Sequence, residues 1–171
     1  MLAVDQCQEA ADTWGFNCGP AALCAVLRKT PDEIRPLMGD FEAKHYTNPT
    51  LMYDVLKRVG ANTRTTYRGD VPCDFPEVEF ALVRVQWGGT WTNAGVPMGA
   101  RYRRTHWVAM RESEEKGREV FDVNAVAFGG WLPFAEWKNE LMPWLAKQTV
   151  PGWDGRIWPT HVIEVLSWTL E

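Results

Sequence analysis

The stretch that decides the fold is WGFNCGPAALCAVL, residues 14–27, which predicts a helix with a cysteine at its first position. Pro20 follows Cys18 closely, and proline suits the first turn of a helix because the N–H that it lacks would have no intrahelical partner there. An apolar stripe at helical spacing comes next and includes Cys24. We therefore predict a helix that begins at Cys18 and buries the face carrying Cys24.

Two more helices are expected in the first sixty residues. Thr30 and Glu33 form a capping-box pattern, and Pro36 predicts that this helix is short. Asn48 precedes a proline and an amphipathic segment, which Gly60 is expected to end. The N-terminal part of the chain is therefore predicted to be mostly helical.

The remainder of the chain has the period-2 alternation of β-strands. Strands are predicted at residues 81–87, 106–110, 119–125 and 160–168, with one helix, weakened by Pro143, in the segment PFAEWKNELMPWL. Helices first and antiparallel strands afterwards predict an α+β fold of two layers, in which the N-terminal helical layer packs on a C-terminal antiparallel sheet.

Composition limits the possible functions. The 171 residues suffice for one domain, which we expect to span 1–171, with 46% hydrophobic and 23% charged residues. A net charge of −4 gives no general electrostatic case for binding nucleic acid. No apolar run is long enough to span a membrane, and the first residues lack the pattern of a signal peptide, so the expected location is the cytoplasm.

Cys18 is the best candidate for a nucleophile. The free N–H groups and the positive end of the dipole at a helix start stabilise a thiolate, which lowers the pKa of a cysteine placed there. Cys24 lies within the apolar stripe and is expected to be a buried, inert thiol. Cys7 and Cys73 have no context that would activate them.

A thiolate nucleophile needs a group that exchanges protons, and histidine is the usual one. His45 lies among polar residues and is expected on the surface, while His161 near the start of the last strand could lie in the core or at an edge. His106 begins a strand directly after a glycine-rich loop at 88–100, which we expect to form a rim or lid. We therefore pair His106 with Cys18.

A third group should orient the imidazole. If 119–125 is a strand, Asp122 and Asn124 share one of its faces, and either could accept a hydrogen bond from His106. An acid in an apolar strand is costly unless it has a partner. That cost favours Asp122, with Asn124 as the alternative.

These residues resemble a known family. The segment CGPAAL at 18–23, then HWV at 106–108, then Asp122 sixteen residues after the histidine are similar to the papain-like cysteine peptidases of the bacteriocin-processing (C39-like) type. The resemblance implies that Cys18 is the nucleophile, His106 the general base and Asp122 the orienting residue.

The resemblance runs from Gln6 to Asn124 and also implies an oxyanion site. In that family a glutamine upstream of the cysteine donates its amide to the oxyanion, together with the backbone N–H of the cysteine. Gln8, ten residues before Cys18, is preferred for this role, and Gln6 is the alternative. The bacteriocin exporters of the family carry an adjoining transporter segment, and this sequence shows none. A stand-alone enzyme of a phage or mobile element is therefore expected.

The expected function is hydrolysis of a peptide, amide or isopeptide bond through a thioester acyl-enzyme, without a cofactor. The expected partner is a peptide or protein substrate. Two alternatives stay open: an acyltransferase or transglutaminase-like enzyme with the same three residues, and a catalytically silent protein of this fold that binds peptides or serves in assembly. A metal site is disfavoured because no closely spaced pair of cysteines or histidines with typical ligand spacing occurs.

Overall fold

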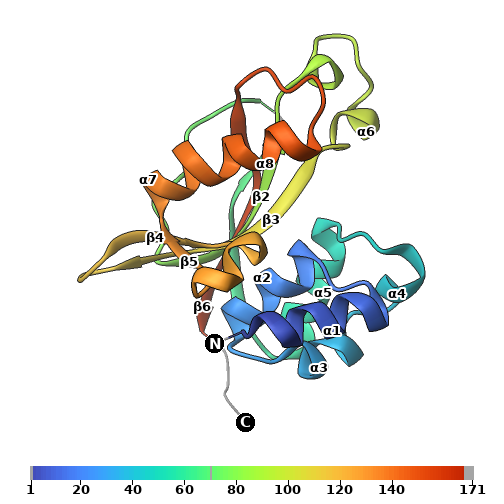
Figure 1. Cartoon of the computed structure of the whole chain (residues 1–171), viewed down its shortest axis with the longest axis vertical. Coiled ribbons are helices and arrows are strands. Elements are labelled where there is room, and N and C mark those ends of the chain that lie inside the picture. Colours follow the sequence, from blue (N-terminus) through green and yellow to red (C-terminus); the bar gives the residue numbers. More distant parts are fainter. Residues whose placement is uncertain (1, 70, 168–171) are drawn as a thin grey trace.

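The N-terminal part of the chain is helical in the computed structural model, which describes residues 2–69 and 71–167. Its helices gather on one side of a sheet (Figure 1). They are α1 (Val4–Trp14), α2 (Cys18–Leu27), α3 (Pro31–Ile34), α4 (Phe41–Lys44) and α5 (Pro49–Arg58). The described residues include no helix that is both long and apolar enough for a membrane span.

Local sequence explains where these helices begin. The side chain of Asn17 caps α2 by accepting a hydrogen bond from the N–H of Gly19, at 3.2 Å. Thr30 and Glu33 form the expected capping box of α3. Asn48 caps α5 in the same way as Asn17 caps α2. The predicted helix at Cys18 is confirmed.

The second half of the fold is a six-stranded sheet in which every neighbouring pair is antiparallel. Its strand order is β1-β6-β2-β3-β4-β5. The strands are β1 (Asn62–Arg68), β2 (Phe80–Trp87), β3 (Thr105–Ser113), β4 (Gly117–Phe121), β5 (Trp131–Pro133) and β6 (Ile157–Ser167). The α+β class is thus confirmed, although β1 and β5 were not predicted, and Trp168 of the last predicted strand lies outside the described residues.

The predicted packing of an N-terminal helical layer on an antiparallel sheet is confirmed, and the other face of the sheet is covered as well, which the expectation of two layers did not include. Leu82 and Trp107 pack with the N-terminal helices, whereas Val83 and Val108 pack with a C-terminal helical segment on the opposite face. Figure 1 shows α7 (Phe134–Glu136) and α8 (Met142–Thr149) on that opposite face. The apolar residues on both faces of β2 and β3 require this third layer.

The C-terminal helical segment runs past Pro143 instead of breaking there. A wide π-helical turn, Trp137–Leu141, joins α7 to α8. A proline within a helix lacks its N–H and crowds the carbonyl four residues earlier. A widened turn immediately before Pro143 accommodates both effects.

The predicted strand at 119–125 ends early, and this is a second correction. β4 stops at Phe121, and Asp122 caps a 3₁₀ helix, Val123–Phe128, by accepting a hydrogen bond from the N–H of Asn124 at 2.9 Å. Aspartate competes with strand pairing by bonding nearby backbone N–H groups. Asp122 and Asn124 therefore do not share the face of a strand.

Candidate active site

His106 and Asp122 form a buried pair at the ends of neighbouring strands. His106 lies at the start of β3 and Asp122 directly follows β4. The Nε2 atom of His106 lies 2.8 Å from Oδ2 of Asp122, and the two residues are 6% and 0% exposed. Because an ionised carboxylate only accepts hydrogen bonds, Nε2 is the donor.

Four donors converge on the carboxylate of Asp122. Besides His106, the indole Nε1 of Trp137 donates to Oδ2 at 2.9 Å. The backbone N–H and the side-chain amide of Asn124 both donate to Oδ1, at 2.9 and 2.8 Å. Burial alone would raise the pKa of Asp122, but the imidazolium and these hydrogen bonds lower this pKa to about 2. The carboxylate is therefore ionised at neutral pH.

Cys18 lies next to this pair at the first position of α2. Its thiol interacts with the imidazole of His106 through a hydrogen bond, for which Nδ1 remains because Nε2 bonds Asp122. Burial opposes the thiolate, but the charge and hydrogen bond of His106, helped by the backbone of Trp107, lower the pKa of Cys18. The arrangement therefore favours a thiolate.

The same neighbours hold the proton on His106. Burial disfavours the imidazolium, yet Asp122 on one side and Cys18 on the other raise the pKa of His106 well above its usual range. Cys18 and His106 thus stabilise each other as a thiolate–imidazolium pair. The ring of Trp87 lies 5.7 Å from the imidazole and shields one side of it.

A cavity of about 570 Å³ opens onto Cys18 and His106. It lies between α1, the start of α2, the 3₁₀ helix after Asp122 and the C-terminal part of α8. Trp87 and Asn124 also line it. A segment of a substrate therefore has room to approach the thiol.

The two candidate glutamines fall in different places. Gln8 lines the cavity of Cys18, and its amide donates to Oδ1 of Asp12 at 2.9 Å, which leaves the second amide hydrogen for another acceptor. Gln6 lines a different cavity together with Cys24. Residues two apart point to different sides of a helix. Of the two, only Gln8 is placed near Cys18.

The alternative orienting residue, Asn124, also has a definite place. Its amide bonds the carboxylate of Asp122 and not the imidazole of His106. Trp137 also belongs to this network, although it was not predicted. Nothing near Trp137 in the sequence distinguishes it from the nine other tryptophans of the chain.

The remaining cysteines have different surroundings. Cys24 is buried, and burial strongly raises the pKa of its thiol. Cys7 lines the cavity of Cys18, but partial burial raises its pKa as well. Cys73 is exposed. Of Cys7, Cys18 and Cys24, only Cys18 has a lowered pKa.

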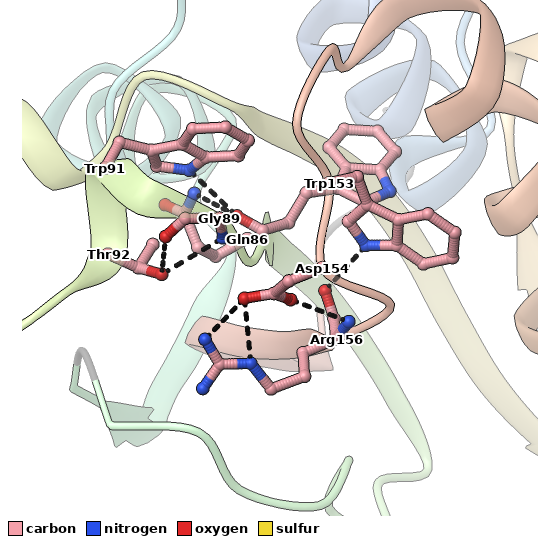
Figure 2. Close-up of polar contacts among 8 residues, drawn as sticks. Gln86, Gly89, Trp91, Thr92, Trp153, Asp154 and Arg156 are labelled. Carbon is pink, nitrogen blue, oxygen red and sulfur yellow. Dashed lines mark hydrogen bonds and ion pairs between the residues drawn. The ribbon is translucent and has the colours of Figure 1, made fainter.

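The glycine-rich loop after β2, expected to form a rim or lid, is tied down where it begins. The N–H of Gly88 donates to the carbonyl of Arg156 at 2.9 Å, and the N–H of Asp154 donates to the carbonyl of Gly88 at 3.2 Å. Figure 2 shows the indole of Trp91 and the ion pair of Asp154 with Arg156 at this junction. This part of the loop buttresses Trp87, whose carbonyl accepts the indole N–H of Trp91.

A thiol, an imidazole and a carboxylate joined in series can carry out nucleophilic acyl transfer. In residues 2–69 and 71–167, no three His, Cys, Asp or Glu side chains gather closely enough to hold a metal ion. Comparisons of the chain with protein-family models, with curated proteins and with solved structures gave no match.

Proposed function

We propose that this protein is a cysteine hydrolase that cleaves a peptide, amide or isopeptide bond through a thioester acyl-enzyme. The observation that carries the proposal is the series from Cys18 to His106 to Asp122, open to a cavity at its thiol end. The order matches the roles that such chemistry needs: a nucleophile, a group that exchanges protons and a carboxylate that holds the imidazole.

Acylation begins when the Cys18 thiolate attacks the carbonyl carbon and the π electrons move to the oxygen. The tetrahedral intermediate collapses as His106 transfers its Nδ1 proton to the leaving nitrogen, which departs as an amine. Water then attacks the thioester while His106 takes one of its protons. Expulsion of the thiolate releases the acid and restores the starting pair.

The oxyanion needs hydrogen-bond donors close to Cys18. The N–H of Cys18 belongs to the first turn of α2, where backbone N–H groups have no partner within the helix. Gln8 lines the same cavity and has an amide hydrogen that Asp12 does not use. We assign these two donors to the oxyanion.

The sequence resemblance supports the same assignment. Papain-like enzymes of the C39-like type place their cysteine on a helix and their histidine in a sheet, and here N-terminal helices pack on an antiparallel sheet. A cytoplasmic enzyme of a phage or mobile element, acting on a peptide or protein, accords with this resemblance.

A covalent probe tests the proposal directly. A peptide that ends in a thiol-directed electrophile should add once to the protein, and digestion followed by mass spectrometry should locate the adduct at Cys18. Cys18→Ala should abolish the adduct and all cleavage of a peptide library, whereas Cys24→Ala should retain both. A chain whose Cys18 stays unlabelled while the exposed Cys73 reacts is not an enzyme of this class. Products that carry an added amine in preference to water would identify a transferase.

A further inference from the structure

A row of basic side chains crosses three neighbouring strands, away from the residues assigned to catalysis. His161 of β6 is the register partner of Arg68 in β1 and of Arg84 in β2. Arg84 is in turn paired with Trp107 of β3, whose indole packs with the N-terminal helices. Register partners point to the same side of a sheet, so the row faces the N-terminal helical layer.

Arg84 is a buried cation that no Asp or Glu of the described residues neutralises. The residue is 9% exposed, and its Nε atom has no hydrogen-bond partner. One Nη donates to Oγ1 of Thr105 at 3.3 Å, and the guanidinium carbon lies 4.8 Å from the ring centroid of Tyr102. No carboxylate within residues 2–69 and 71–167 forms an ion pair with it. A buried charge left in this way is costly unless a ligand supplies the missing partner.

The row borders a cavity of about 760 Å³ that suits an anion. Arg68, Arg84 and His161 line it, together with Thr50 and Tyr53 of α5, and its lining residues within 2–69 and 71–167 include no Asp or Glu. Burial and the charges of Arg84 and Arg68 lower the pKa of His161 to about 4, so the imidazole is neutral at pH 7. Arg84 therefore faces neutral hydrogen-bonding groups and a second cation, a setting that favours a carboxylate.

The cavity lies close to the proposed nucleophile. Arg84 is near enough to Cys18 for the thiolate to act on its pKa, although burial is the larger influence and lowers it. Its strand partner, Trp107, directly follows His106 in β3.

We propose that this cavity is a specificity subsite that takes a carboxylate of the substrate peptide, with Arg84 as its main ligand. The assignment rests on the proposed hydrolase function for the identity of the ligand as a peptide. Two sources share this chemistry: an acidic side chain and a C-terminal carboxylate. Arg84 specifies the charge in either case, while Arg68 and His161 complete the cradle.

Binding is measured in the Cys18→Ala protein, so that the result does not depend on turnover. Four probes form two matched pairs: acetyl-Ala-Glu amide against acetyl-Ala-Gln amide, and acetyl-Ala-Ala acid against acetyl-Ala-Ala amide. The imidazole resonances of ¹³C-labelled histidine report the site through His161. We expect a carboxylate to bind about ten- to a hundredfold more tightly than its neutral partner, as for one lost charge-assisted contact. The pair that shows this difference identifies the source.

Matched variants test the role of Arg84. Arg84→Gln should abolish the preference for the carboxylate, whereas Arg64→Gln should keep it, because Arg64 on the same sheet already pairs with Glu164. Arg84→Gln should also raise the thermal midpoint, since an unpaired buried charge is removed. Arg68 is exposed, and Arg68→Gln should weaken the preference for the carboxylate in part. This variant tests the subsite if Arg84→Gln does not fold.

Two results would overturn the subsite. One is equal binding of the charged and neutral probes, and the other is a carboxylate preference that survives Arg84→Gln. Carboxylate binding at His161 combined with an unreactive Cys18 in the unaltered protein would instead retain the anion site and reject the hydrolase.

Discussion

Two buried histidines on strands that flank β2 have opposite electrostatic surroundings. His106 of β3 bonds the carboxylate of Asp122, whereas His161 of β6 is surrounded by the cations Arg84 and Arg68. Burial lowers the pKa of both imidazoles. The neighbouring charges then raise the pKa of His106 well above its usual range and help to lower that of His161 to about 4.

The contrast shows that neighbouring charges, and not depth in the protein, decide what each histidine can do. An imidazole held as a cation stabilises a thiolate and later donates a proton, which suits His106 beside Cys18. A neutral imidazole between cations adds no further charge and leaves a positive site open to an anion. Single substitutions around the two histidines test this contrast.

The largest effect is expected from removing the imidazole beside the nucleophile. His106→Ala should reduce kcat/KM by at least about a thousandfold, because base and nucleophile act as one unit. The same change should raise the pKa of Cys18, since its cationic partner is gone. Measuring the alkylation rate of Cys18 by iodoacetamide against pH checks this.

His161→Gln is the matched control for that experiment. It removes the other buried histidine, so the alkylation profile of Cys18 should keep its lowered midpoint. An unshifted Cys18 titration in His106→Ala would mean that the two side chains do not interact and would break the proposed mechanism.

The next largest effect is expected at the carboxylate. Asp122→Asn should lower the free energy of unfolding by about 3 kcal/mol. The NH₂ group of the new amide would face N–H groups that donate hydrogen bonds to the carboxylate in the unaltered protein. Rotating the new amide gives no relief: Oδ2 receives His106 and Trp137, and Oδ1 receives two hydrogen bonds from Asn124. Chemical denaturation measures the loss, and peptide hydrolysis should fall with it.

The loss in Asp122→Asn should depend on pH in a defined way. The folded pKa of Asp122 is below its unfolded value of about 3.9, so its contribution is present above pH 4 and disappears toward pH 2. The folded pKa of His106 is above its unfolded value of about 6.5. The contribution of His106 to stability is therefore fully present below pH 6.5 and is lost as the pH rises through the folded pKa. The difference in free energy of unfolding between Asp122→Asn and the unaltered protein should therefore be largest between about pH 4 and 6.5. A difference that grows above pH 7 would contradict the ion pair.

The sequence predicted much of this arrangement because local rules determine it. The helix start at Cys18 was predicted from the early proline and the apolar stripe, and Asp122 from the cost of an unpaired acid. The strand assignment behind Asp122 was nevertheless wrong, because the same carboxylate caps a turn. Contacts between distant segments, such as Trp137 with Asp122, depend on how the predicted helix PFAEWKNELMPWL packs on the sheet, which local patterns do not determine.

A smaller effect is expected from His161 as the pH falls. Its folded pKa of about 4 is below the unfolded value of about 6.5, so the unfolded chain binds the extra proton and stability declines between these two values. His161→Gln should remove up to about 1.4 kcal/mol per pH unit of this slope. Arg84→Gln should also flatten it, since one of the repelling charges is gone. Unfolding curves recorded from pH 7 to 4.5 give the free energy of unfolding against pH for the unaltered protein and both variants. Equal slopes in all three proteins would contradict the placement of His161 beside the cations.

The smallest effect is expected from Trp137→Phe, which removes one of the four donors to Asp122 and keeps an aromatic ring in the core. The lost hydrogen bond to a charged acceptor should cost about 1–2 kcal/mol of stability. It should also raise the pKa of Asp122 slightly, because one contact that favours the ionised form is gone. His106 keeps its own bond to the carboxylate, so kcat should fall only several-fold and the acid midpoint of unfolding should move up. A fall in kcat as deep as that of His106→Ala would show that Trp137 holds the imidazole itself in place, and the carboxylate would then not be what sets the two histidines apart.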